Sequence, residues 1–209
     1  MIPRLCLSPL LCDDELIRHT TPAERAEAAA FNPRRRREWL TWRAVVRRTL
    51  EAPVSFVYDA AGAPQLVGSS LQLTVSHAAD RVAVLLAGRP CGLDLERLDR
   101  KFPQLADRYL SPAEQRLSDD PHFLAAAWCA KEALYKFSRD VRLSLLYDLR
   151  IERFERLPAD APAGLLVEGG TLRPYASLTA RIGGGEPLRL TAARLGDEHM
   201  AVWTVEEPF

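Results

Sequence analysis

Two long segments with helical periodicity, residues 22–50 and 122–139, divide the chain and limit the folds that it can adopt. In the first segment, apolar side chains recur at the spacing of one helix face. Each segment is followed by short runs that are β-branched or alternate between apolar and polar residues, as antiparallel strands do. We therefore predict an α+β fold. The strand-like runs lie at residues 54–58, 71–75, 82–87 and 93–98 after the first helix, and at 145–154, 165–167, 172–182, 188–193 and 200–205 after the second.

These segments form two successive groups, with a break near residues 98–112 that has the pattern of short helices at 102–110 and 112–117. No direct sequence repeat relates the two groups. An apolar stretch at residues 5–12 runs straight into three acids, and we interpret it as a first strand rather than a signal peptide. The α+β fold is therefore expected to have an N-terminal and a C-terminal half.

The charges of the chain are balanced, with 28 basic and 28 acidic side chains among 209 residues. This balance argues against a strongly charged partner such as nucleic acid or an anionic membrane. No apolar run approaches the roughly 20 residues that a membrane-spanning helix needs. The four cysteines show neither C-x-x-C nor disulfide spacing, so we predict free thiols and a cytoplasmic protein.

Lysine is rare in this chain and clusters in one helical segment. Only three of the 28 basic residues are lysines, and two of them lie in WCAKEALYK, residues 128–136. On a helix, Trp128, Glu132 and Lys136 share one face, with Lys131 beside them. A Glu–Lys pair at this spacing is common on a solvated face, where arginine would serve equally well. The choice of lysine favours a confined site in which a point charge meets one phosphate oxygen.

The run CGLDLE, residues 91–96, places two acids on one face of a strand. Because successive side chains of a strand alternate, Asp94 and Glu96 point the same way and lie roughly 7 Å apart. Such a face is often only the wet side of a half-buried strand. Two carboxylates on one face are also ligands that Mg²⁺ takes when phosphate oxygens and water complete its shell.

Two further polar patterns lie upstream of these acids. Ser76 and His77 end a strand-like run without the glycines of a nucleophile elbow, so they are either a hydrogen-bonding pair or a phosphate contact. The helical residues 34–48 carry many arginines against the single acid Glu38. Such a cluster is usually a solvated helix face, but several guanidinium groups also suit a dianionic phosphate.

The order of these motifs is more specific than any one of them. Along the chain come an arginine-rich helix, G-x-P, S-H, G-L-D-L-E and W-x-x-K-E-A-x-x-K. This succession, which spans residues 34–136, resembles the Sfp-type 4′-phosphopantetheinyl transferases. Enzymes of that family move the phosphopantetheine arm of coenzyme A onto a serine of an acyl or peptidyl carrier protein.

The resemblance implies a fold, a cofactor and partners. The fold would be a monomer of two similar α+β halves, here residues 1–98 and 99–209, packed with pseudo-two-fold symmetry around an active-site cleft. Coenzyme A would be the co-substrate and Mg²⁺ the cofactor. The protein partner would be an acidic acyl or peptidyl carrier protein, with no role for nucleic acid or membrane.

The resemblance also assigns roles to individual residues, position by position. Asp94, Glu132 and Lys136 would be catalytic, with Glu132 or a metal-bound water as the base for the carrier serine. The metal ligands would be Asp94, Glu96 and Glu132, and Lys136 would contact the coenzyme pyrophosphate. The remaining coenzyme contacts would be Ser76, His77, Arg43, either Arg35 or Arg36, and Lys131 at the edge of the site.

Two positions depart from the family pattern. Its G-K-P loop reads Gly62-Ala63-Pro64 here, which removes one cation from the coenzyme pocket, and the glycine-rich stretch after the K-E motif is replaced by residues 137–140. The alanine at position 63 leaves open a non-catalytic protein that binds coenzyme A or a carrier protein, and the arginines of the helix at 34–48 leave open a nucleic-acid-binding protein. The intact acids disfavour the first, and the balanced charge disfavours the second.

Overall fold

The computed structural model describes residues 2–158 and 160–206 and has mixed α+β architecture. Helices and short strands follow one another largely as the sequence patterns predict. The elements in chain order are β1 (Arg4–Pro9), α1 (Asp13–His19), α2 (Pro22–Ala28), α3 (Pro33–Leu50), β2 (Phe56–Tyr58), β3 (Pro64–Leu66), β4 (Gln72–Ala78), β5 (Arg81–Ala87), β6 (Cys91–Arg97), the 3-10 turns η1 (Phe102–Gln104) and η2 (Ala106–Arg108), α4 (Pro112–Gln115), α5 (Phe123–Ser138), β7 (Leu149–Arg156), β8 (Leu166–Glu168), β9 (Leu172–Ile182), β10 (Leu188–Leu195) and β11 (His199–Val205).

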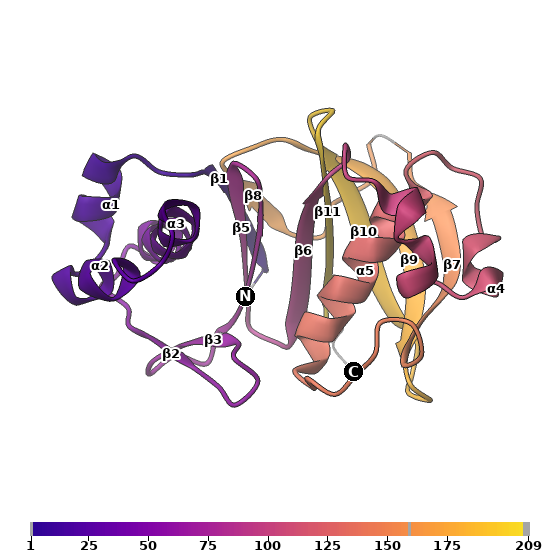
Figure 1. Cartoon of the computed structure of the whole chain (residues 1–209), viewed down its shortest axis with the longest axis horizontal. Helices are drawn as coiled ribbons and strands as arrows, with labels where there is room; N and C mark the ends of the chain where they lie inside the picture. The colour runs from indigo at the N-terminus through magenta and orange to yellow at the C-terminus, as the bar shows by residue number, and fades with distance from the viewer. Residues whose placement is uncertain (1, 159, 207–209) are drawn as a thin grey trace.

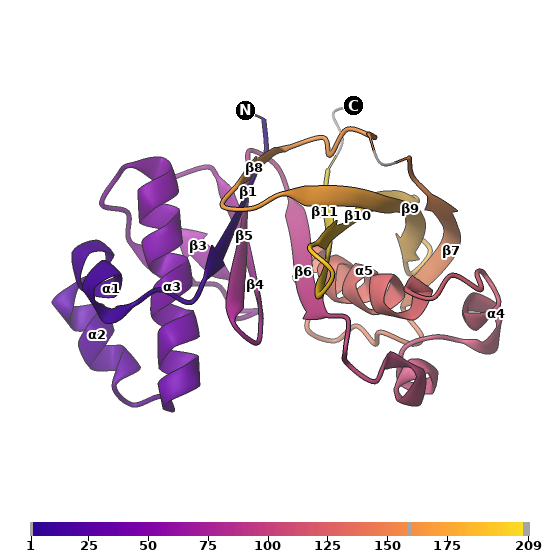
Figure 2. The same cartoon turned by 90° about the horizontal axis from the view of Figure 1, so that it is seen from above.

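Within the described residues, the strands form two main sheets that pack against each other (Figure 1). The first sheet has the order β4-β5-β1-β8 and the second the order β6-β11-β10-β9-β7, while β2 and β3 form a small hairpin. Helix α3 covers the outer face of the first sheet and α5 covers that of the second, as Figure 2 shows from above. This arrangement of helix, sheet, sheet and helix confirms the predicted α+β fold with two halves.

The alternation of side chains along β6 determines where its polar groups point. Cys91, Leu93 and Leu95 are buried in the apolar layer between the two sheets. Gly92 and Asp94 therefore point to the opposite face, where α5 packs. A strand with a fully apolar inner face thus carries its acids toward the helix.

Gly92 marks a point where α5 comes very close to β6. A Cβ atom at this position would lie 2.0 Å from the carbonyl oxygen of Ala133 and 2.9 Å from Cβ of Phe137. We expect Gly92→Ala to lower the free energy of unfolding by about 2 kcal/mol, because the helix backbone must move to make room. Urea denaturation measures this loss, and Gly88→Ala, where nothing lies within 4 Å of the new Cβ, is the control. Equal stability of the two variants would contradict the close packing.

The predicted helix at residues 22–50 is in fact two helices, α2 and α3, so this prediction was wrong. Asn32 caps α3 by accepting a hydrogen bond from the backbone nitrogen of Arg35, and Pro33 occupies its first turn. Because proline has no N–H to donate, a helix readily begins there but does not pass through. The segment predicted as a helix at 102–110 forms the turns η1 and η2, and the sequence patterns did not indicate α1 or β3.

Two strands pair across the boundary between the halves at residue 98, because each joins a strand of the other half. Strand β6 pairs with β11 in the second sheet, although most of the second sheet comes from the C-terminal half. Strand β8 pairs with β1 in the first sheet, and this pairing is parallel rather than antiparallel as predicted. Strand β4 packs directly against β6. The exchange ties the two sheets together and brings polar residues of β4 next to those of β6.

All four cysteines lie within the described residues and are free thiols, as predicted. Burial raises the pKa of Cys6 to about 11 and that of Cys91 to about 12, so both stay protonated and unreactive at neutral pH. Among the described residues, no helix combines the length and the apolar character that crossing a membrane requires.

Candidate active site

Asp94 is the centre of a polar cluster between β6, β4 and α5. Its Oδ1 accepts hydrogen bonds from Lys136 Nζ at 2.7 Å and from Ser76 Oγ at 2.8 Å. Lys136 also donates to the carbonyl oxygen of Leu93 at 3.1 Å, and Ser76 Oγ accepts from the backbone nitrogen of Leu95 at 3.1 Å. Each of the three elements contributes one side chain, so the cluster joins the two sheets.

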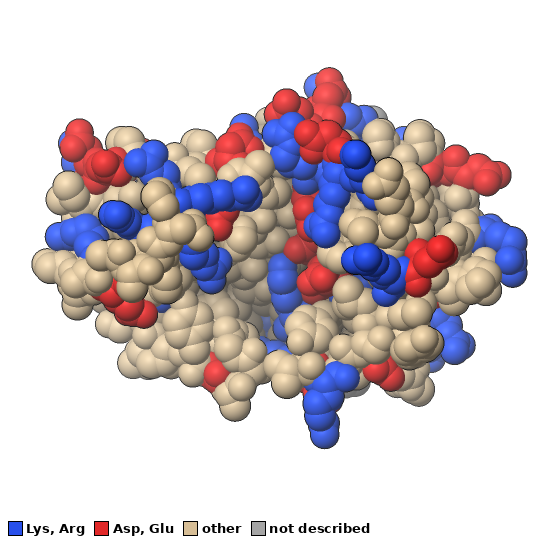
Figure 3. Space-filling view, viewed as in Figure 1, with Lys and Arg blue, Asp and Glu red and all other residues tan. Residues whose placement is uncertain are grey.

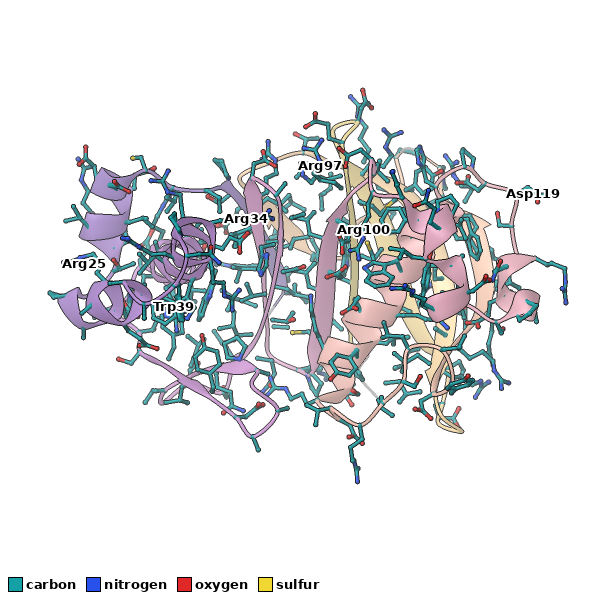
Figure 4. The ribbon with its side chains drawn as sticks, in the orientation of Figure 1. Arg25, Arg34, Trp39, Arg97, Arg100 and Asp119 are labelled. Carbon is teal, nitrogen blue, oxygen red and sulfur yellow. The ribbon has the colours of Figure 1, made fainter. Side chains whose placement is uncertain are left out.

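Glu96 lies two residues further along the same face of β6. Its Oε1 accepts a hydrogen bond from Trp128 Nε1 at 2.9 Å and also pairs with the guanidinium of Arg100. Arg100 stacks over the Trp128 ring at 4.3 Å, beside α5 in Figure 4. Burial, and then repulsion from Asp94, raises the pKa of Glu96 above its usual range.

Glu132 completes the acidic part of the cluster from α5, one turn before Lys136. Burial, and then repulsion from Asp94, raises the pKa of Glu132 as well. Glu96 and Glu132 are therefore both close enough to Asp94 for the negative charge of Asp94 to disfavour their ionised forms. The shared face of Trp128, Glu132 and Lys136 does point toward the acids of β6, since Trp128 contacts Glu96 and Lys136 contacts Asp94.

The chemistry of these acids fits a hard divalent cation. The second oxygen of Asp94, Oδ2, is buried and has no hydrogen-bond partner among the described residues. A buried carboxylate oxygen without a partner is costly, and carboxylate oxygens are donors that Mg²⁺ prefers. No group of three or more His, Cys, Asp or Glu side chains in the described ranges surrounds one point. Instead, Lys136 and Arg100 neutralise Asp94 and Glu96.

A cavity of about 200 Å³ lies beside Lys136. The end of α5, strand β4 and the turn between β2 and β3 line it, so both halves contribute. Figure 3 shows basic and acidic side chains gathered in the hollow between the two lobes. Ala63 and Arg139 both line this cavity, and Arg139 donates hydrogen bonds to Asp59 and Gln72 at 3.0 Å each. Arg139 thus brings a cation to the cavity where the loop itself has alanine.

His77 lies on the side of β4 that faces α3. Its Nε2 is 3.1 Å from Nη1 of Arg35, and its Nδ1 is 3.4 Å from Oε2 of the buried Glu38. The other carboxylate oxygen of Glu38 pairs with Arg34 Nε at 2.8 Å. Burial lowers the pKa of His77; Glu38 opposes this shift, and the charge of Arg35 adds to it.

Arg35, rather than Arg36, contacts His77, a choice that the sequence left open. Arg36 lines a separate hollow between α1 and α3. Arg43 is buried against two tryptophan rings and donates to the Tyr58 hydroxyl at 3.0 Å. The positions of Arg36 and Arg43 therefore give no support to the prediction that they bind the coenzyme.

Lys131 is not part of the cluster, and the structure gives its predicted coenzyme contact no support. It is fully buried, with its Nζ 2.7 Å from Oε1 of Glu114 and 2.9 Å from the carbonyl oxygen of Leu145. Neighbouring helical residues point about 100° apart, so Lys131 cannot share the direction of Glu132. A narrow buried site that admits only one point charge explains why this residue is a lysine rather than an arginine.

Sequence reasoning missed three residues that the structure places at the site. Glu38 was visible only as the single acid of an arginine-rich helix, and nothing in the spacing connected it to His77. Arg100 lies four residues after Glu96, which is no recognised pairing distance at the end of a strand. Arg139 approaches the cavity because the chain leaves α5 there with a left-handed backbone, φ 55°.

Comparison with known protein families covers the part of the chain that holds β6 and α5. Residues 90–192 match the 4′-phosphopantetheinyl transferase superfamily, and this stretch contains Asp94, Glu96, Glu132 and Lys136. A search of curated proteins found no match. Over residues 90–192, the chain belongs to the 4′-phosphopantetheinyl transferase superfamily.

Proposed function

We propose that this protein transfers the 4′-phosphopantetheine arm of coenzyme A to a serine of an apo acyl or peptidyl carrier protein. The observation that carries the proposal is the Asp94 cluster: Lys136, which lines the cavity, donates to Oδ1 of Asp94, and Oδ2 of the same carboxylate has no partner among the described residues. The Sfp-type subclass rests on the motifs upstream of residue 90. We expect the protein to be a monomer in the cytoplasm, a reducing compartment in which its cysteines would remain free thiols.

The acids of the cluster have a clear role in such a reaction. Asp94, through Oδ2, would hold Mg²⁺ together with Glu96 and Glu132. When bound, the ion neutralises charge on the pyrophosphate of the coenzyme. Glu132 is the candidate base for the carrier serine. In the free protein, Lys136 and Arg100 pair with Asp94 and Glu96.

Lys136 would stabilise the group that leaves. The serine oxygen forms a bond to the β-phosphorus, the bond from that phosphorus to the bridging oxygen breaks, and 3′,5′-adenosine bisphosphate departs. Lys136 lines the cavity, and its Nζ has a third hydrogen to donate beyond those given to Asp94 and Leu93. A point charge here favours the negative charge that develops on the leaving phosphate.

The direct test is incubation with coenzyme A, Mg²⁺ and a panel of apo-carrier proteins, followed by intact-mass spectrometry. The expected result is the added mass of one phosphopantetheine arm on at least one carrier, absent when the carrier serine is replaced by alanine. Binding of coenzyme A without any added mass would instead identify a non-catalytic binding protein. Salt-sensitive binding to nucleic acid, with neither of these, would reject the proposal altogether.

The alanine of the cavity loop leads to a further expectation. Ala63→Lys should tighten coenzyme A binding by about 1 kcal/mol, because a partly exposed ammonium would gain a phosphate partner. Calorimetry at fixed ionic strength measures the gain. Ala61→Lys, two residues away in the same turn, tests whether any added charge suffices. Unchanged binding of Ala63→Lys would mean that Arg139 already fills this role.

A further inference from the structure

Glu38 is a buried acid that stands behind a more exposed histidine. The Glu38 side chain is 5% exposed, whereas that of His77 is 37% exposed. One carboxylate oxygen faces His77 Nδ1 at 3.4 Å, and the other pairs with Arg34. On the opposite edge of the imidazole, Nε2 meets Arg35 at 3.1 Å. The ring is thus held between an acid and a cation.

The contact with Arg35 determines the protonation of the free site. A guanidinium can only donate hydrogen bonds, so Nε2 must be the acceptor and carries no proton. The single proton of the neutral ring is then on Nδ1, which faces Glu38. The charges around the ring agree with a neutral state, because Arg34, Arg35 and Lys136 surround it against the one acid Glu38.

A dianionic phosphate would change this balance. It would attract the guanidinium of Arg35 and release Nε2, which could then take a proton and donate to a phosphate oxygen. Glu38 would stabilise the resulting imidazolium from its Nδ1 side. Without the buried carboxylate, the protonated ring would face Arg34 and Lys136 with no compensating charge.

We propose that Glu38 and His77 form a proton-accepting dyad, in which binding of the 3′-phosphate of coenzyme A to Arg35 and His77 is accompanied by uptake of one proton. The inference rests on the proposed function, since it takes coenzyme A as the ligand. Glu38 is a positioning residue here, because it acts on the ligand only through His77.

The direction of the pH dependence follows from linkage. The dyad gains a proton on binding, so the pKa of His77 is higher in the complex than in the free protein. The affinity for coenzyme A is therefore highest at low pH, and this gain is lost as pH rises through the pKa of His77 in the complex. Between the two pKa values, the dissociation constant should rise nearly tenfold for each pH unit.

Calorimetry in buffers of different ionisation enthalpy at about pH 7.5 measures the proton uptake directly. The wild-type protein should take up about one proton with coenzyme A and none with 3′-dephospho-coenzyme A. Glu38→Gln and His77→Gln should both lose the uptake and bind coenzyme A at least tenfold more weakly, yet bind the dephospho form normally. Glu15→Gln removes a more exposed acid that pairs with Arg48 and should behave as wild type. Normal binding of the dephospho form also shows that the variants are folded.

Nitrogen-15 NMR of the free protein adds a test that needs no ligand. The His77 signal, assigned by its loss in His77→Gln, should show an unprotonated Nε2 at neutral pH. Proton uptake that persists in Glu38→Gln, or a protonated Nε2 in the free protein, would reject the dyad.

The outcomes also separate the dyad from the proposed function. Coenzyme binding and carrier modification without proton uptake would reject the dyad and leave the proposed function standing. Failure of both binding and carrier modification would reject the function and the dyad together.

Discussion

Asp94→Asn is expected to lower the transfer rate about a thousandfold, or about 4 kcal/mol of transition-state stabilisation, in a protein that remains folded. Lys136 and Ser76 both donate to Oδ1, which an amide oxygen can replace. The amide nitrogen would then stand where Oδ2 now lies without a partner. The amide N–H groups would direct partial positive charge at a bound cation, whereas Oδ2 directs a lone pair at it. The substitution therefore keeps the protein contacts and removes the metal contact.

The asparagine variant is a sharper test than Asp94→Ala. Alanine would remove the oxygen that accepts hydrogen bonds from Lys136 and Ser76, and the loss of activity could then come from a misplaced lysine. Stopped-flow transfer assays at saturating Mg²⁺ give the rate, and Mn²⁺ binding followed by electron paramagnetic resonance gives the metal affinity. Asp119→Asn, at an exposed position far from Arg100 in Figure 4, is the control. Full activity or unchanged Mn²⁺ affinity of Asp94→Asn would show that Asp94 serves only to join β6 to α5.

The acidic cluster could be predicted because its geometry is local. Alternation along a strand places Asp94 and Glu96 on one face, and helical periodicity places Glu132 four residues before Lys136. Only one long-range fact was needed, namely that β6 and α5 pack against each other. Gly92 carried that information, since it is the residue that allows the close approach to Ala133.

The anion-binding side of the site could not be predicted to the same degree. Which arginine of residues 34–37 faces the cleft depends on the start of α3, and a shift of one residue rotates every side chain by about 100°. The Asn32 cap sets that start, whereas the sequence pattern had suggested one continuous helix from residue 22. The burial of Arg43 and the pairing of Lys131 with Glu114 likewise depend on tertiary contacts that charge and spacing do not reveal.

The fold shows the same division between local and long-range information. Four strands of the C-terminal half were located to within two residues, because alternation and glycine turns mark them, whereas β7 begins four residues later than predicted. The sheet to which β6 and β8 belong was not apparent, since pairing partners lie far away in the chain. This matters for function, because only the placement of β6 beside β4 allows Ser76 to bond Asp94.

Replacement of Lys136 is expected to have the second large effect. Lys136→Met removes the charge and should lower kcat/KM about a hundredfold, the loss typical of one preorganised donor to a developing anion. Lys136→Arg keeps the charge and should still lose at least tenfold, about 1.4 kcal/mol. The lysine ammonium sits between Leu93 O and Asp94 Oδ1, at 3.1 and 2.7 Å. A guanidinium is wider and longer, so it cannot keep both contacts beside the tightly packed β6 and also reach the same phosphate oxygen.

The other lysines of the chain supply the control for this argument. Lys101 is exposed, and Lys101→Arg should change neither stability nor kcat/KM. Lys131 is unsuitable, because arginine would not fit its closed site against Glu114. Steady-state kinetics with a modified carrier as the readout, and urea denaturation as the check on folding, separate the cases. If Lys136→Arg were as active as Lys101→Arg, the site would tolerate a planar guanidinium group as well as an ammonium group. The rarity of lysine would then say nothing about phosphate binding, and the role of Lys136 would have to be argued from its contact with Asp94 alone.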